Sequence, residues 1–159
     1  MMRKLDQRGV AALEFCLVAV PLFTLMFAIF DFGRYAITMQ SLRMLANAGA
    51  RANMINCYTP AVIANTSPSS CTGDYLSVAQ KQAVAPFLYA GGLTPTLHVC
   101  GPQTVATNDC PIQTANVLTV TASQPNFTLV FPKINFFMVF PKIWGTALNA
   151  PSASTSIPF

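Results

Sequence analysis

A run of apolar residues near the N-terminus constrains this chain more than any other feature of its sequence. Of the 21 residues from 10 to 30, 18 are apolar, and the exceptions are Glu14, Pro21 and Thr24. As an α-helix, a run of this length extends about 31 Å, which is the thickness of the hydrocarbon core of a bilayer. The apolar segment, residues 10–30, is therefore predicted to be a transmembrane helix.

The composition of the remaining chain resembles that of a folded domain with few charges. The 159 residues are 53% hydrophobic and 9% charged, whereas a soluble domain carries about 25% charged residues. Without the apolar segment the hydrophobic share falls to about 48%, a normal value. Intrinsic disorder is excluded, because it requires low hydrophobicity and high charge. A nucleic-acid partner is not expected, because the net charge is only +4 and the basic residues are scattered.

The residues before the apolar segment predict its orientation. Residues 1–9 carry Arg3, Lys4 and Arg8 against a single acid, Asp6. Since short basic ends stay in the cytoplasm, we expect a cytoplasmic N-terminus and a C-terminal domain on the outer side. A cleaved secretory signal peptide is the weaker alternative. The apolar segment exceeds the 7–15 residues of a signal core, and no small-x-small cleavage site follows it.

Glu14 is the unusual residue of the apolar segment, because a carboxylate in hydrocarbon is costly. Its bland interpretation is an acid that reaches the lipid headgroups near the cytoplasmic face. However, a short basic leader, Gly9, four apolar residues, Glu14 and Phe15 together resemble a prepilin-type (class III) signal. That resemblance implies cleavage between Gly9 and Val10 by a prepilin peptidase. It also implies that Glu14 pairs with the free amine of Val10 in a neighbouring subunit, since each charge is costly alone.

A longer stretch, residues 9–52, is similar to the N-terminal region of TadE-like proteins, which are minor pilins (pseudopilins) of the tight-adherence, or Flp, type IV pilus. The resemblance implies a single-pass protein of the bacterial inner membrane with a periplasmic C-terminal domain, which is incorporated in a pilus or helps to assemble one. It implies other pilin subunits and the pilus assembly platform as partners. No cofactor is expected, because the sequence shows no ligand-binding motif. The residues that carry it are Gly9, Glu14, Phe15, Pro21, Asp31, Phe32, Gly33, Arg34, Gly49 and Arg51.

Beyond residue 30 the pattern becomes amphipathic and predicts that the same helix continues. We expect one helix over residues 10–56, of which residues 10–30 span the membrane and residues 31–56 lie outside it. The small-residue run from Ala46 to Ala50 packs either on its own domain or on another subunit. The apolar positions that follow helical spacing are Ile37, Leu45, Ala48, Ala52 and Ile55.

Four cysteines, Cys57, Cys71, Cys100 and Cys110, follow the predicted helix and lie on the outer side. An even number in an oxidising compartment suggests disulfides, and four cysteines allow three pairings. We favour Cys57–Cys71 and Cys100–Cys110, because both pairs close short loops rich in turn residues. A metal site is not expected, since no CxxC spacing occurs. Cys16 is most simply a small hydrophobic residue.

Residues 57–159 are predicted to form an α+β domain, in which the long helix packs on a small antiparallel sheet as in pilin-like proteins. Residues 74–89 have helical spacing, and Thr96–Cys100 and residues 115–122 have strand patterns. A third strand is expected at residues 127–131. The Ser/Pro-rich tail is expected to be loose, apart from an edge strand near residues 146–150. A repeated motif, residues 130–134 and 139–143, belongs to an aromatic segment that fills the core or forms an apolar patch.

The sequence contains no catalytic constellation, because there is one histidine, no phosphate-binding loop and no nucleophile elbow. We therefore expect a non-enzymatic minor pilin. Two alternatives remain: an anchored surface or periplasmic binding module that works outside a pilus, and a secreted enzyme released by signal peptidase.

Overall fold

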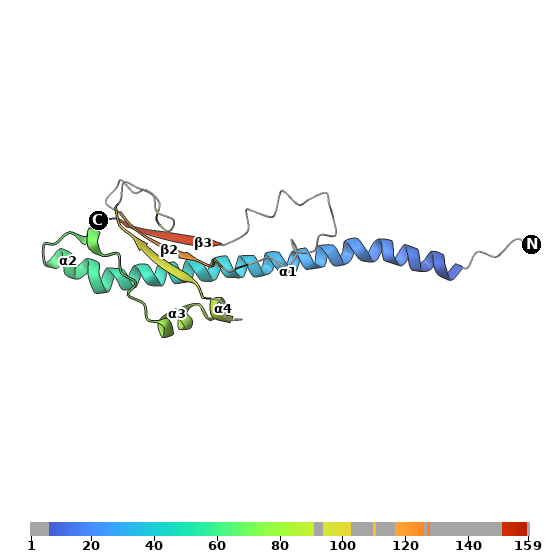
Figure 1. The fold of residues 1–159 in the computed structure, drawn as a ribbon, viewed down its shortest axis with the longest axis horizontal. Helices are drawn as coiled ribbons and strands as arrows, with labels where there is room; N and C mark the ends of the chain where they lie inside the picture. Colours follow the sequence, from blue (N-terminus) through green and yellow to red (C-terminus); the bar gives the residue numbers. More distant parts are fainter. Residues whose placement is uncertain are drawn as a thin grey trace, which may run out of the picture.

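The computed structural model describes residues 7–90, 94–102, 110, 117–125, 127 and 151–158. Its main element is α1 (Gln7–Asn53), a helix of 47 residues that extends about 70 Å. The other described elements pack along the part of α1 nearest its C-terminal end, while its N-terminal part projects from them (Figure 1). The described molecule is thus a rod with a small domain at one end.

The helical path is longer than the predicted helix at residues 10–56. It starts at Gln7, because the leader residues Gln7 and Arg8 are good helix formers. Beyond α1 it continues as a π-helical turn, η1 (Met54–Tyr58), and then as α2 (Thr59–Ile63). Pro60 lies in the first turn of α2, where its fixed φ angle fits the helical backbone.

The predicted α+β architecture, with a small antiparallel sheet, is confirmed. The sheet has three strands in the order β1–β2–β3: β1 (Thr96–Cys100), β2 (Val117–Ser123) and β3 (Ser152–Pro158). Both pairings are antiparallel, and Val120 of β2 stands opposite Val99 of β1. β1 has the predicted bounds, and β2 lies two residues inside the predicted start.

The strand predicted at residues 127–131 stays a prediction, because the structure describes only its first residue, Phe127, which lies outside any strand. Residues 128–131 fall outside the described residues, as do residues 146–150 and both copies of the repeated motif. The tail was expected to be loose, and this expectation is wrong, because the tail forms β3. Its small apolar residues alternate with serines, so that Ala153 and Ile157 are buried while their neighbours face outward. The serine content concealed a period-2 pattern.

The helix predicted at residues 74–89 is shorter and is divided into α3 (Val78–Val84) and α4 (Pro86–Tyr89). It starts late because Ser77 and Gln80 form a reciprocal capping box, which fixes the N-terminus at Val78. It is divided because Pro86 disfavours a helical conformation at Ala85. A 3₁₀ turn, η2 (Pro68–Ser70), precedes these helices.

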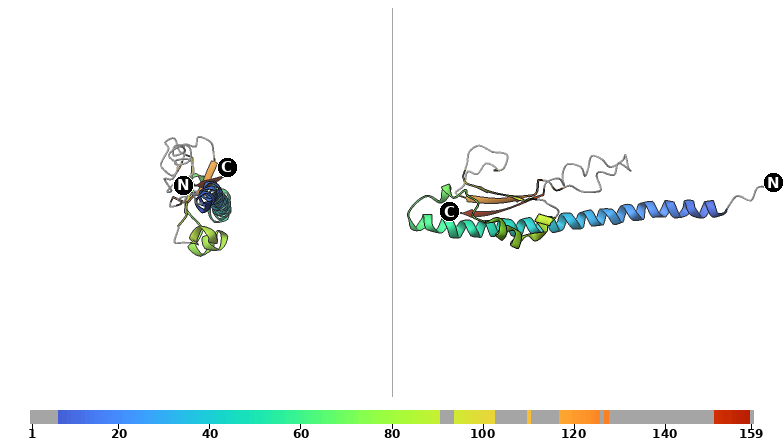
Figure 2. Two further views of the ribbon diagram at one scale, coloured as in Figure 1. Left: turned by 90° about the vertical axis from the view of Figure 1, so that its right-hand side faces the viewer. Right: turned by 60° about the horizontal axis from the view of Figure 1, so that its bottom comes forward.

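The hydrophobic core lies between α1 and the sheet, and α3 and α4 cover a different side of α1 (Figure 2). Of the predicted apolar positions, Leu45 is fully buried, whereas Ile37 and Ile55 are exposed. Leu42, which was not among the predicted positions, has no exposed surface either. The core comprises Leu42, Leu45, Ala46, Ala50, Leu88, Leu97, Val99, Leu118, Val120, Ala122, Ala153 and Ile157, among others.

Gly49 marks the closest approach of α1 to the sheet. A Cβ atom placed on Gly49 would lie 2.8 Å from Leu97 Cδ2 and 3.1 Å from Val120 Cγ1. The small-residue run around Gly49 therefore packs on its own domain, which is the first of the two interpretations of that run. Gly33, by contrast, has no atom within 4 Å of an added Cβ.

This contrast gives a matched pair of variants. Gly49→Val is expected to lower the free energy of unfolding by about 1–3 kcal/mol, because its side chain overpacks the helix–sheet contact. Gly33→Val makes the same change of helix propensity at an open position and serves as the control. Urea unfolding of the full chain in detergent, followed by circular dichroism, compares them. Equal unfolding midpoints for the two variants would show that the close approach at Gly49 does not limit stability.

Two disulfides cross-link the domain: Cys57–Cys71 and Cys100–Cys110. This is the pairing favoured from the short loops. Cys71 is fully buried, and Asn53 at the end of α1 donates a hydrogen bond from Nδ2 to its carbonyl oxygen at 2.7 Å. The first bridge and this hydrogen bond together hold the returning chain against the outer end of the helix.

Candidate functional site

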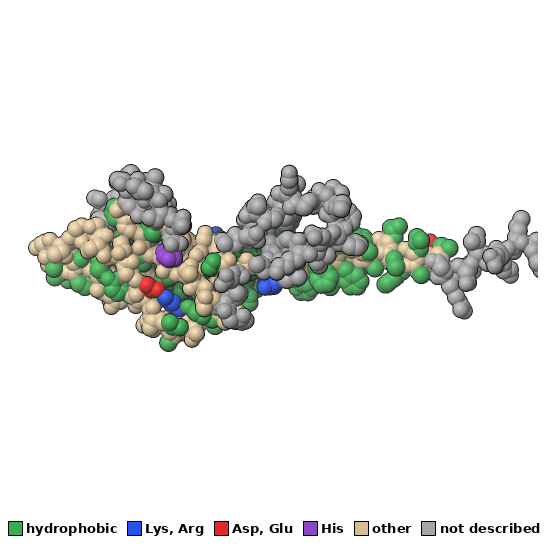
Figure 3. Space-filling model, in the orientation of Figure 1, with side chains coloured by type: hydrophobic (Ala, Val, Ile, Leu, Met, Phe, Trp, Pro, Cys, Tyr) green, Lys and Arg blue, Asp and Glu red, His purple; other side chains and the backbone are tan. Residues whose placement is uncertain are grey.

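Most of the exposed large apolar side chains among the described residues lie in the apolar segment. Its large side chains are 40–71% exposed, and none of its best 18-residue window is buried inside the domain. Figure 3 shows hydrophobic side chains along the part of α1 that projects from the domain. The helix is long and apolar enough to cross a membrane. Such a surface requires lipid or other apolar helices around it.

Glu14 lies on this exposed surface, one helical turn beyond Val10. No described residue forms an ion pair with its carboxylate. Its neighbour Phe15 is 71% exposed. The structure therefore leaves both the predicted assembly residues available to another molecule. Gly9 and Val10 lie in the first turn of α1, where the backbone N–H groups have no partner within the helix.

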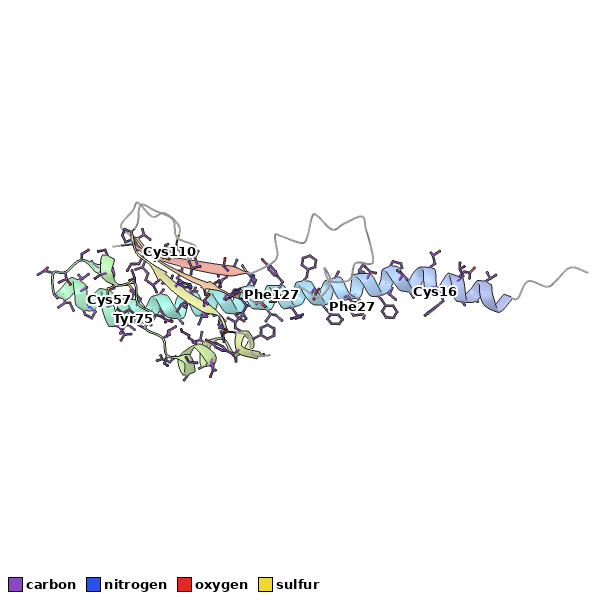
Figure 4. The ribbon with its side chains drawn as sticks, in the orientation of Figure 1. Cys16, Phe27, Cys57, Tyr75, Cys110 and Phe127 are labelled. Carbon is purple, nitrogen blue, oxygen red and sulfur yellow. A yellow bond between two sulfur atoms is a disulfide. The ribbon has the colours of Figure 1, made fainter. Side chains whose placement is uncertain are left out.

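The residues at the exit of the apolar segment hold the domain against the helix. Asp31 is buried, and its Oδ1 lies 3.8 Å from Nη1 of Arg34. The guanidinium of Arg34 lies 5.8 Å from the ring centre of Phe127, and Tyr35 meets the same ring edge-on at 6.1 Å. Figure 4 shows Phe127 beside α1, between the sheet and the exposed part of the helix that carries Phe27 and Cys16.

Beside this contact lies a pocket of about 270 Å³ between α1, α4 and the end of β2. We name it the junction pocket. The residues that line it include Arg34, Thr38, Phe87, Leu88, Gln124 and Phe127. Gln124 is 1% exposed and donates a hydrogen bond from Nε2 to the carbonyl oxygen of Leu88 at 3.4 Å. Its Oε1 atom is buried without a hydrogen-bond partner.

The residues of the predicted motif do not converge on one site. Glu14 and Asp31 are 17 positions apart on one helix, about 26 Å, and Gly49 lies about 23 Å beyond Arg34. Glu14 lies in the apolar segment, and Gly49 lies in the core. Asp31 and Arg34 lie where the apolar segment ends and the domain begins. Arg51 is exposed on the outer part of α1. The motif residues are thus spread along the helix and do not form one cluster.

Three side chains at these contacts were missed from the sequence: Asn53, Gln124 and Phe127. Phe127 was assigned to a strand, and Gln124 stands in an unremarkable Ser-Gln-Pro sequence. Neither carries a local pattern, because Gln124 bonds to Leu88 and Phe127 packs on Tyr35, both of which are distant in the sequence. Among the described residues, no three His, Cys, Asp or Glu side chains lie close enough together to hold a metal ion.

The comparisons with known proteins bear on the same part of the chain. Residues 9–51 match the family model described as TadE-like protein. The resemblance over residues 9–52 is thereby confirmed, and it fits a pilus-associated protein of the tight-adherence system. No curated protein and no solved structure matches the chain.

Proposed function

We propose that this chain, whose exposed helix is TadE-like, is a minor pilin (pseudopilin) that takes part in assembling a tight-adherence pilus or a related secretion filament. The observation that carries the proposal is an apolar helix surface that bears a carboxylate and that its own domain leaves uncovered. An anchored domain needs only an apolar span. A costly acid in that span calls for a partner outside the chain.

The partner that fits Glu14 is the free amine of Val10 in a neighbouring subunit, formed by cleavage after Gly9. Both groups lose most of their hydration when helices pack in lipid or in a filament core, and pairing relieves both penalties. The pair also sets the axial register of two parallel helices. The register matters because apolar helix surfaces slide past one another at little cost, whereas a single polar contact specifies one alignment.

The proposed topology is a single pass through the bacterial inner membrane. The basic leader keeps the N-terminus in the cytoplasm, and the domain lies in the periplasm. Two disulfides in the domain support this side, because disulfides persist in oxidising compartments. The expected partners are the prepilin peptidase, other pilin subunits and the pilus assembly platform.

Processing gives the first test of this proposal. In cells with the prepilin peptidase, the chain is expected to lose residues 1–9 and to begin at Val10. The reason is that Gly9 and Val10 lie in the first, weakly held turn of α1, where local unwinding costs few hydrogen bonds. Intact-mass spectrometry of the purified membrane protein measures the loss, with a peptidase-deficient strain as the control. An intact leader in the presence of the peptidase would rule out the processing step.

A further inference from the structure

The junction pocket lies at the depth of the lipid headgroups if the apolar segment fills the hydrocarbon core. Arg34 and Thr38 stand four and eight residues beyond Phe30, about 6 Å and 12 Å along the helix axis. The polar layer on each side of the hydrocarbon core is about 5–8 Å thick. Arg34 therefore lies at the depth of the phosphate and amine groups of phospholipids, and Thr38 lies just beyond them.

Gln124 shows which chemical group the pocket lacks. The nitrogen of its amide must face the carbonyl oxygen of Leu88, because a carbonyl oxygen only accepts hydrogen bonds. The amide oxygen, Oε1, is then left buried without a donor. A buried acceptor without a partner is costly. The pocket thus favours an occupant that carries an N–H or O–H donor.

The charged side chains near Gln124 further limit which chemical groups the bound ligand can carry. Arg34 presents a half-exposed guanidinium, which suits a phosphate. Asp31, 3.8 Å from that guanidinium, disfavours a purely anionic ligand. Phe87, which is 42% exposed, offers a ring surface that attracts an alkylammonium group. A group with one negative and one positive end meets all of these requirements.

We infer that the junction pocket binds the headgroup of a phospholipid with a primary ammonium, of the phosphatidylethanolamine class. The phosphate lies against Arg34, and the ammonium donates a hydrogen bond to Oε1 of Gln124. The volume of about 270 Å³ suits a group of this size, since sites for drug-sized ligands start at about 300 Å³. The bound lipid fixes the depth and the rotation of the domain at the membrane surface. This inference depends on the membrane span and not on assembly into a pilus.

Headgroup chemistry provides the test. The full chain is purified in detergent and titrated with phosphatidylethanolamine or phosphatidylcholine of identical acyl chains, and native mass spectrometry counts the bound lipid. Phosphatidylcholine has the same phosphate and positive charge but no N–H, so the ethanolamine lipid is expected to bind about tenfold more tightly. Dimethylated phosphatidylethanolamine, which keeps one N–H, is expected to bind like the parent lipid.

Variants assign the selectivity to the pocket. Gln124→Met keeps the length of the side chain and removes the acceptor, so the preference for ethanolamine should fall to about onefold. Arg34→Ala should weaken both lipids, whereas Arg43→Ala, an exposed arginine further along the same helix, should change neither. Equal binding of the two lipids by the wild-type chain overturns the inference without any variant. Selectivity that survives Gln124→Met, or equal binding of soluble phosphoethanolamine without acyl chains, also overturns it.

Failure here and failure of the proposed function can be told apart. Lipid selectivity is measured on the purified chain, in which no other pilin subunit is present. If the purified chain shows no lipid selectivity but pilus assembly is normal, the lipid-binding inference is wrong and the proposed pilin function stands. If the chain binds the lipid selectively but plays no part in pilus assembly, the proposed function is wrong and the lipid-binding inference stands.

Discussion

Removal of the Cys57–Cys71 bridge is expected to lower the free energy of unfolding of the domain by about 3 kcal/mol. The bridge closes a loop with a sequence separation of 14, and a closed loop of this length limits the unfolded chain by about that amount. The bridge also joins η1 to the segment that leads back along α1 toward α3. Without it, the hydrogen bond from Asn53 to Cys71 and the packing of this segment on the core remain to hold the return.

The measurement is urea unfolding of the Cys57→Ala/Cys71→Ala double variant in detergent, followed by circular dichroism. Alanine is chosen because Cys71 is fully buried and serine would bury a hydroxyl group there. Cys16→Ala is the matched control, since Cys16 is a free, exposed cysteine on the apolar segment. A double variant that unfolds within about 1 kcal/mol of the wild-type chain would contradict the expected role of the bridge.

The features that could be predicted from the sequence are those that repeat or that close locally. The apolar segment shows itself because a bilayer demands about 20 apolar residues in succession. β1 was predicted with its observed bounds because Leu97 and Val99 alternate with Thr96 and His98. The disulfide pairing follows from short loops, and short loops are the ones that a chain closes at least cost.

The features that could not be predicted depend on the partner surface. Ile37 and Ile55 follow the same helical spacing as Leu45, yet only Leu45 is buried. Only the position of the sheet decides which stripe is covered. β3 was missed because its serine-rich sequence does not indicate a buried strand. Its residues alternate in burial only because they pair with β2 in the observed register. The role of Gln124 could not be predicted, because it depends on α4 lying beside the end of β2. Gln124 and its partner Leu88 are 36 positions apart in the sequence.

Glu14→Ala is expected to leave the chain folded and inserted in the membrane but to reduce its association with other pilin subunits at least about a hundredfold. Glu14 is exposed and forms no ion pair with any described residue of the domain, so unfolding should be unchanged. The substitution removes a carboxylate from the apolar segment and makes insertion easier. In the assembled state, however, the amine of a neighbouring Val10 would remain buried without its anion. Breaking a buried pair in this way costs about 3–5 kcal/mol.

Pulldown of tagged chain from membranes and counting of surface pili measure the effect, and Thr24→Ala is the matched control. Thr24 is also a polar residue of the apolar segment, but its hydroxyl donates to Val20 of its own helix at 2.7 Å. Its removal therefore changes the polarity of the span without removing a group that seeks a partner. Normal pili and normal pulldown from Glu14→Ala would favour an anchored binding module outside a pilus. An equal loss from Thr24→Ala would show that the span as a whole, and not the acid, directs assembly.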